Sequence, residues 1–255
     1  MIAWRTFVAV LGRDVFVTGR ELPSFLAQVV IQPFFTLFIF GKVLVAISYV
    51  QGDYGQVLLP GVVALNGFLG ALQNTTLPLV LDFSWTREIE DRLLAPISIS
   101  LVAVEKMVFG ALRGLVSALL MVPIGIAILG VSWPLSSLPL VLVVLVLGSL
   151  AGAAIGMVIG TSVPPRRINI MFAVILTPLM FTGATQFPWP QLESLKWFQI
   201  LCALNPLTYV SEAIRAVLIP SVPHMALWVS LPVLTLAIAI FGALGMRGFM
   251  RRALD

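Results

Sequence analysis

The chain contains a run of 52 consecutive residues without a charged side chain, from Gly114 to Pro165. A bilayer hydrocarbon core about 30 Å thick is crossed by roughly 20 helical residues, so the run is long enough for two crossings. In its middle, the segment 130–137 holds Gly130, Pro134 and three serines, which favour a turn. This run therefore predicts two membrane spans joined by a short turn.

The composition extends this prediction to the whole chain. Of 255 residues, 60% are hydrophobic and only 10% are charged, whereas soluble domains carry about 25% charged residues. One or two soluble domains are excluded, because so few charges do not build a water-facing surface around a core of this size. We expect an all-α membrane protein with a single transmembrane domain over 1–255 and six transmembrane helices, at 23–45, 57–81, 107–129, 138–159, 168–181 and 225–244.

Lysines and arginines indicate the orientation, because they are enriched in cytoplasmic loops. Six spans place both termini on one side, together with 11 of the 15 basic residues: Arg5, Arg13, Arg20, Arg87, Arg92, Lys106, Arg166, Arg167, Arg247, Arg251 and Arg252. We therefore predict a multi-pass protein of the bacterial cytoplasmic (inner) membrane with both termini cytoplasmic. The net charge of +4 is interpreted as a topology signal and not as a nucleic-acid site.

Two segments differ from the spans. Residues 1–21 place apolar side chains at helical spacing among charges, which predicts an amphipathic helix in the cytoplasmic interface; a simple membrane anchor is the alternative. Residues 182–223 hold apolar pieces about 8 to 12 residues long, separated by prolines. Such lengths favour short re-entrant or interfacial helices on the outer side over full crossings.

The largest cytoplasmic loop, 82–106, combines a charge cluster with two leucines and a proline. We expect a short helix there, ended by Pro96. A soluble partner would bind it through its leucines, with the charges fixing the register, whereas the alternative is a solvated loop that only sets topology. The candidate coupling residues are Arg87, Glu88, Glu90, Asp91, Arg92, Leu93 and Leu94.

Four glycines stand at four-residue spacing in the fourth predicted span: Gly148, Gly152, Gly156 and Gly160. This spacing puts them on one helix face, where another helix can approach closely. The partner helix belongs either to the same chain or to a second copy. Arg113 lies within the third span, where it either reaches the cytoplasmic headgroups or has a functional role.

The sequence provides no catalytic constellation. His224 and Cys202 are the only residues of their types and stand too far apart in the sequence to form a zinc site. The GxxxxGK[ST] phosphate-binding loop is absent. We therefore expect a protein that is not an enzyme, with no metal and no cofactor of its own.

Two segments resemble type-2 ABC exporter permeases, particularly those of the daunorubicin-resistance type. Glu88, Arg92, Leu93, Leu94, Pro96 and Ser98 are loosely similar to the family's loop between the second and third spans. The C-terminal signature of the family is matched by Phe181, Gly183, Phe187, Pro188, Trp197, Asn205, Pro206, Tyr209, Glu212 and Arg215. The length and the six-span plan also agree, so the resemblance covers essentially the whole chain.

The resemblance implies a permease subunit that depends on a separate cytoplasmic ABC ATPase, which would bind ATP and Mg²⁺. It also implies that loop 82–106 docks on this ATPase and that a second permease copy, or a related chain, completes the transport path. The low charge of the spans favours an apolar or amphiphilic substrate, and the resemblance also allows a glycolipid-type substrate or a polar polysaccharide. The alternatives are a proton-coupled secondary transporter, a membrane enzyme and a non-transporting assembly subunit. The first is disfavoured by the absence of Asp, Glu and His in the middle of the spans.

Overall fold

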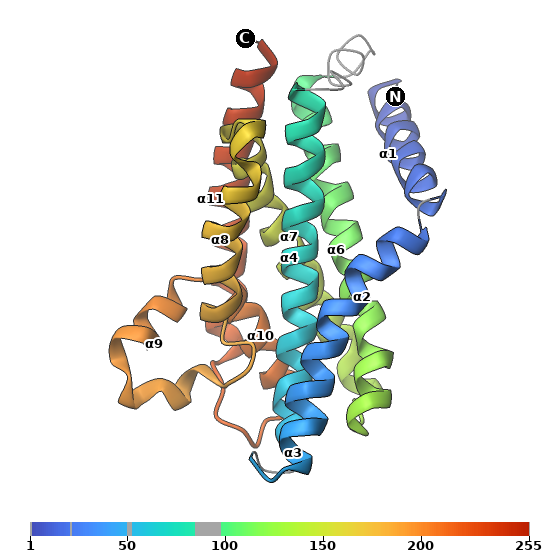
Figure 1. Ribbon diagram of the computed structural model, residues 1–255. Coiled ribbons are helices and arrows are strands. Elements are labelled where there is room, and N and C mark those ends of the chain that lie inside the picture. Colours follow the sequence, from blue (N-terminus) through green and yellow to red (C-terminus); the bar gives the residue numbers. More distant parts are fainter. Residues whose placement is uncertain (1, 21, 50–52, 85–97, 255) are drawn as a thin grey trace.

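The computed structural model describes residues 2–20, 22–49, 53–84 and 98–254, which form helices and connections without any β-strand. Figure 1 shows a bundle of steeply inclined helices with the N- and C-termini at the same end, here called the terminal end. The opposite end, near α3, is called the distal end. This arrangement agrees with the expected all-α class.

The long helices overlap the predicted spans. The helices are α1 (Ile2–Arg20), α2 (Leu22–Phe38) with the π-helical turn Ile39–Val43 and α3 (Leu44–Ala46), α4 (Tyr54–Ser84), α6 (Ile99–Leu129), α7 (Leu138–Ser162), α8 (Ile168–Thr182), α9 (Lys196–Ala203), α10 (Pro206–Leu218) and α11 (Leu227–Leu254). However, α6 begins eight residues before its predicted span and α11 ends ten residues after its own. Gly130 ends α6 with a left-handed backbone (φ 70°), so the predicted turn between the third and fourth spans is confirmed.

Among the described residues, five helical segments are long and apolar enough to cross a membrane: Phe25–Ala46, Tyr54–Phe83, Ile99–Leu129, Leu135–Ser162 and Leu227–Leu254. The fifth predicted span is α8, which has 15 residues. At 1.5 Å per residue it is about 22 Å long, shorter than the hydrocarbon core. The expected count of six spans therefore stays a prediction.

The centre of the bundle is α4, which lies against α6, α7 and α10. Glycines bring these helices into close contact. A Cβ atom at Gly152 of α7 would overlap the carbonyl oxygen of Phe68, and one at Gly114 of α6 would overlap that of Gly67. Helices in lipid associate mainly through such van der Waals contact, because the bilayer offers no hydrophobic drive between them.

The glycine stripe of α7 packs against other helices of the same chain. Gly152, Gly156 and Gly160 face α4, and Gly148 faces Val210 of α10. The contacts that the structure shows for the stripe lie within one chain, as in the first of its two interpretations. In α8 no residue is fully buried, although Ile175, Leu176 and Leu179 are partly buried against the core.

The loop 82–106 is shorter in the structure than expected, because α6 begins at Ile99, eight residues before the predicted span. Ser98 caps the helix by accepting a hydrogen bond from the backbone nitrogen of Leu101 (3.4 Å). The predicted third span began only after the last charged residue of the loop. In the structure, charged side chains before that point are buried against one another. Lys106 Nζ lies 2.7 Å from Asp82 Oδ2 and 3.9 Å from Asp14 Oδ2.

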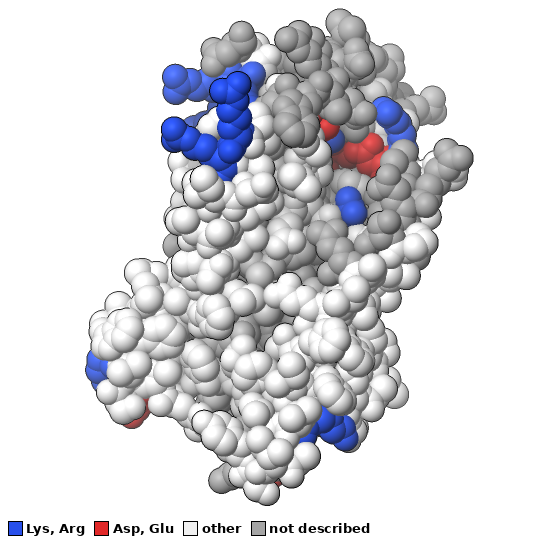
Figure 2. Space-filling model, viewed as in Figure 1, with Lys and Arg blue, Asp and Glu red and all other residues white. Residues whose placement is uncertain are grey.

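The same ion pairs join α1 to α4 and α6 at the terminal end. Phe7 of α1 is buried, whereas Val8 and Phe16 are exposed, so α1 presents apolar side chains outward as well as toward α6. Its position in the cytoplasmic interface stays a prediction. On the face shown in Figure 2, charged side chains gather toward the two ends and leave a broad uncharged band between them.

Candidate functional site

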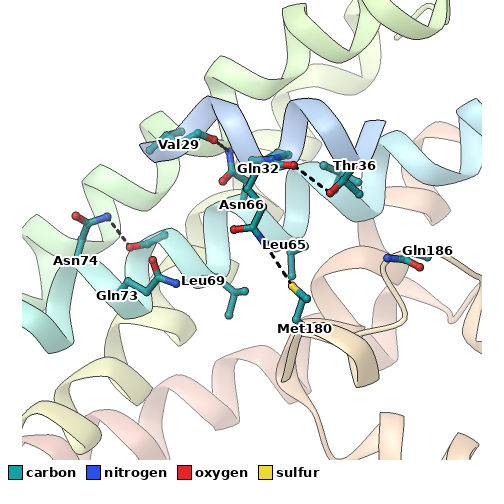
Figure 3. Close-up of a pocket in the computed structure, with 13 residues that line it drawn as sticks. Val29, Gln32, Thr36, Leu65, Asn66, Leu69, Gln73, Asn74, Met180 and Gln186 are labelled. Atoms are coloured by element: carbon teal, nitrogen blue, oxygen red, sulfur yellow. Dashed lines mark hydrogen bonds between the residues drawn. The ribbon is translucent and has the colours of Figure 1, made fainter. Parts of the chain in front are cut away.

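A groove in the uncharged band is lined by amides. It lies between α2, α4 and the end of α8, and it encloses about 110 Å³ (Figure 3). Its polar lining residues are Gln32, Thr36, Asn66, Gln73, Asn74 and Gln186. We call it the amide groove. No described lining residue carries a charge, so the groove presents only neutral hydrogen-bonding groups.

Several of these side chains are held by hydrogen bonds to the backbone of the helices. The Asn66 amide nitrogen donates to the carbonyl oxygens of Val29 (3.3 Å) and Ser117 (2.9 Å), which joins α4 to α2 and α6. The Asn74 amide donates to the carbonyl oxygen of Gly70 at 2.7 Å. These bonds use the amide nitrogens and orient the side chains. The three amides of α4 lie in the middle of a helix of 31 residues, where polar groups are costly unless they serve packing or a polar path.

A second cavity of about 320 Å³ continues the groove, because Gln73 and Asn74 line both. Arg113 and Phe172 complete its lining together with Leu77 and Pro78. The Arg113 guanidinium carbon lies 4.9 Å from the ring centroid of Phe25 and 5.8 Å from that of Phe109, in cation–π contact. The intramembrane arginine singled out from the sequence therefore lies beside this polar path, half-buried between α2 and α6.

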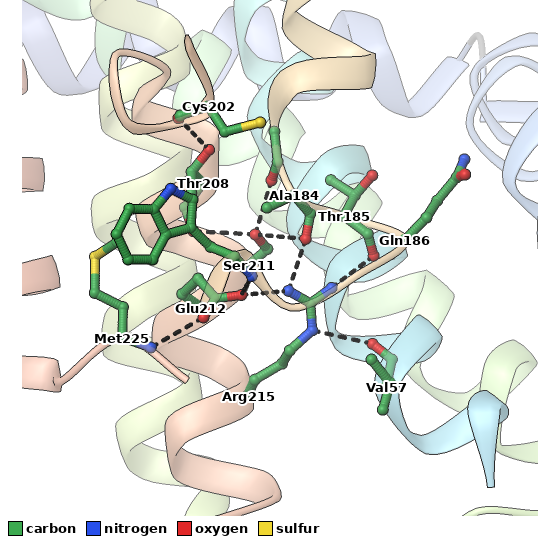
Figure 4. Close-up of polar contacts among 12 residues, drawn as sticks. Val57, Ala184, Thr185, Gln186, Cys202, Thr208, Ser211, Glu212, Arg215 and Met225 are labelled. Carbon is green, nitrogen blue, oxygen red and sulfur yellow. Dashed lines mark hydrogen bonds and ion pairs between the residues drawn. The ribbon is translucent and has the colours of Figure 1, made fainter. Parts of the chain in front are cut away.

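The distal end holds a buried ion pair (Figure 4). Arg215 Nη1 lies 2.7 Å from Glu212 Oε1, and neither side chain is exposed. Arg215 also donates to the carbonyl oxygens of Val57 (3.2 Å), Ala184 (2.6 Å) and Thr185 (2.7 Å). Burial lowers the pKa of Arg215 and the charge of Glu212 raises it, and a guanidinium stays protonated under both influences.

Glu212 connects two further segments. Its Oε1 accepts a hydrogen bond from the Trp189 backbone nitrogen (3.0 Å), and its Oε2 accepts one from that of Met225 (2.9 Å). The ion pair thus ties α10 to α4, to the connection after α8 and to the approach to α11. The i,i+3 spacing of Glu212 and Arg215 is the sequence signal for this pair.

The other signature residues belong to the same distal unit. Asn205 caps α10 by accepting from the Leu207 backbone nitrogen (3.0 Å), and its amide donates to the Leu179 carbonyl oxygen (2.8 Å). Pro206 occupies the first turn of α10. Tyr209 Oη donates to the carbonyl oxygen of Ala203 (2.7 Å).

The first part of the signature packs onto this unit. Gly183 lies so close to Leu207 that a Cβ there would overlap its side chain. Pro188 is buried, and the Phe187 ring lies 6.1 Å from that of Phe198. The structure therefore brings most of the signature residues into one unit, whereas Phe181 and Trp197 of the signature are exposed.

The predicted coupling residues Arg87, Glu88, Glu90, Asp91, Arg92, Leu93 and Leu94 lie outside the described residues. The described residues that flank this segment in the sequence include Asp82, which pairs with Lys106, and Glu105, which is fully buried. Sequence reasoning missed this buried cluster and also the amides of the groove. The signal for the groove was present as Asn66, Gln73 and Asn74 inside a predicted span.

Comparison with known proteins identifies the fold family. Residues 5–219 match the family model described as ABC-2 type transporter. Two relatives are named "Putative transport permease ycf38". The one from Cyanophora paradoxa is 26% identical over 215 residues, covering 81% of this chain and 72% of the relative. The one from Porphyra purpurea is 26% identical over 215 residues, covering 82% and 72%. With a family match over most of its length, the chain belongs to the ABC-2 type transporter family of membrane proteins.

Proposed function

We propose that the chain is the permease subunit of an ABC exporter and moves an amphiphilic substrate across the bacterial inner membrane, driven by a separate cytoplasmic ATPase. Membership of the ABC-2 family and the transport permease relatives support the general role of membrane transporter subunit. The substrate, the partner ATPase and the direction of transport are parts of the proposal.

The observation that carries the proposal is the amide groove. Its amides stand halfway along α4, at the depth where lipid offers no hydrogen-bond partner. The groove and the cavity beside Arg113 share Gln73 and Asn74, so the two adjoin, and in this proposal they form one polar path through the apolar bundle. Such a path suits an amphiphile, whose neutral polar groups would bind the amides while its apolar part lies against Val62, Leu65 and Leu69.

A second copy of the chain covers the groove in this proposal. One wall of the groove is α2, which exposes Ile31 (56%) and Phe35 (55%), and α8 beside it exposes Ile170 (65%) and Val174 (63%). A single copy would leave the amides open to lipid at a cost of several kcal/mol for each unsatisfied group. Two copies facing each other through α2 and α8 would enclose them, with either a homodimer or a pair of related chains supplying the partner.

The terminal end is assigned to the cytoplasm, because most basic residues gather there. In the proposed topology α8 is the additional crossing that makes six, the short helices after it are re-entrant on the outer side, and the distal end faces outward. The ATPase would bind the coupling loop around Glu90, and α1 would follow its motion through the ion pair network of Lys106. ATP and Mg²⁺ would be bound by the partner, and this chain would supply no catalytic group.

Purification in mild detergent followed by reconstitution tests the proposal. We expect an ABC ATPase to co-purify, and we expect the pair to move an amphiphile in vesicles only with ATP. Replacing Glu88, Glu90, Asp91 and Arg92 by alanine should uncouple ATP hydrolysis from transport while membrane insertion stays intact. Transport by the isolated chain, or transport driven by a proton gradient, would overturn the proposal.

A further inference from the structure

Toward the distal end, the lining of the amide groove includes Gln186. A separate cavity of about 380 Å³ lies at the distal end, lined by Asp53, Tyr54, Val57 and Phe187 among others. We call it the distal cavity. Gln186 lines both the distal cavity and the amide groove, so the segment that carries it, residues 184–186, stands at the boundary between the two. We call this segment the distal turn.

Each carbonyl group of the distal turn accepts a hydrogen bond from a side chain of another element. Arg215 Nη1 and Nη2 donate to the carbonyl oxygens of Ala184 and Thr185 at 2.6 and 2.7 Å. Tyr54 Oη donates to that of Gln186 at 2.8 Å. Figure 4 shows the turn passing directly over the guanidinium. The turn is therefore fastened to α10 at one end and to the start of α4 at the other.

The backbone of the turn is held in an unfavourable conformation. Ala184 has φ 48°, in the left-handed region that alanine rarely adopts. Opposite it on α4 stands Gly61, where a Cβ atom would overlap the carbonyl oxygen of Thr185 and lie 2.7 Å from Arg215 Nη2. The turn is strained, lies against a helix position that has no side chain, and is held by a few hydrogen bonds. It can adopt a second conformation once these bonds break.

We infer that the distal turn is the outer gate of the transport path, closed in this structure and latched by Arg215 and Tyr54, with Glu212 as the residue that positions Arg215. The inference rests on the proposed role of the amide groove as the path. Release of the turn would join the groove to the distal cavity. Tyr54 lies at the start of a membrane-crossing helix that also carries the groove amides, so a shift of α4 would act on the latch directly.

Thiol labelling in intact cells tests this gate. Gln73→Cys places a thiol in the groove behind the turn, and Gln186→Cys places one at the boundary. A membrane-impermeant maleimide added outside should label the second rapidly and the first slowly. Tyr54→Phe removes one hydrogen bond to the turn and should raise the labelling rate of Gln73→Cys about five-fold. Gly61→Ala should raise it as well, because the added methyl group pushes the turn away without removing a donor.

Two matched controls separate gating from general loosening. Tyr209→Phe also removes a bond from a hydroxyl to a carbonyl oxygen in the distal unit, but to Ala203 and not to the turn. Gly55→Ala also adds a methyl group to α4, where it meets Leu129 at an ordinary 3.5 Å. Both should leave the rate unchanged. The gate is refuted if Gln73→Cys reacts as fast as Gln186→Cys in the otherwise native chain, or if Tyr54→Phe and Gly61→Ala have no larger effect than their controls.

The assay requires neither an ATPase nor transport. A chain that shows gated labelling but moves no solute with an ATPase would refute the proposed function and keep the gate. A chain that transports but shows no gated labelling would refute the gate and keep the proposed function.

Discussion

The guanidinium of Arg215 and the carboxylate of Glu212 meet at 2.7 Å with no exposed atoms, one helical turn apart on α10. Breaking such a pair from one side leaves an uncompensated buried charge, which costs about 3 to 5 kcal/mol. The pair also fixes the connections on both sides of α10, so its loss should be felt well beyond that helix.

We expect Glu212→Gln to lower the thermal unfolding midpoint of the detergent-solubilised protein strongly. The double variant Glu212→Gln, Arg215→Met should be less destabilised than the sum of the two single changes, because it removes both charges. Arg166→Gln changes an exposed arginine and serves as the control. Additive losses in the double variant would contradict the coupling.

Close contact between α4 and α7 predicts a large effect from a single methyl group. Gly152→Ala should destabilise the protein by about 1 to 3 kcal/mol, because its Cβ would overlap the backbone of Phe68. Gly242→Ala in α11 adds the same methyl group where nothing lies within 4 Å. Unfolding monitored by tryptophan fluorescence should separate the two variants, and equal midpoints would contradict the packing account.

The amide groove predicts a loss of transport without a loss of stability. Gln73→Leu keeps the approximate volume and removes the hydrogen-bonding group. Transport of a neutral amphiphile by the complete complex should fall about ten-fold, as expected for the loss of one or two hydrogen bonds to a substrate. Thr235→Val on the exposed face of α11 should transport normally. Equal rates for both variants would remove the groove from the path.

Cys202 is the single cysteine of the chain and is fully buried in α9. Burial raises the pKa of its thiol, so less of the reactive thiolate is present at neutral pH than in a free cysteine. Maleimide should label it slowly at pH 7, and faster as the pH rises toward its elevated pKa. Leu201→Cys on the exposed side of the same helix should react rapidly. Rapid labelling of the native chain at pH 7 would contradict the described burial.

Much of the fold was predictable, because lipid imposes simple rules on sequence. Uncharged length alone located the helices that became α4, α6, α7 and α11, and Gly130 with Pro134 located the turn between two of them. The error at the start of α6 came from using charges as span limits. Lys106 is buried there by its pairing with Asp82, and a sequence does not reveal which charges find partners across helices.

The candidate site was predicted less completely. The C-terminal signature selected Arg215 and Asn205, and the structure shows why they belong together. The amides inside a predicted span signalled polar positions, but they did not indicate that these positions line one groove. Asn66, Gln73 and Asn74 become a site only when α2 and α8 are placed beside them, and that placement depends on tertiary packing.

The contact between α4 and α7 has a mechanical consequence. Where Gly152 and Gly156 meet the carbonyl groups of Phe68 and Leu72, main chain rests on main chain, and there are no long side chains between the helices to change rotamer and absorb displacement. The two helices would then respond to a load as one stiff beam. A push at the end near Asp82 would then be carried by both helices toward the end near Tyr54, where small displacements decide whether the hydroxyl group still reaches its carbonyl oxygen.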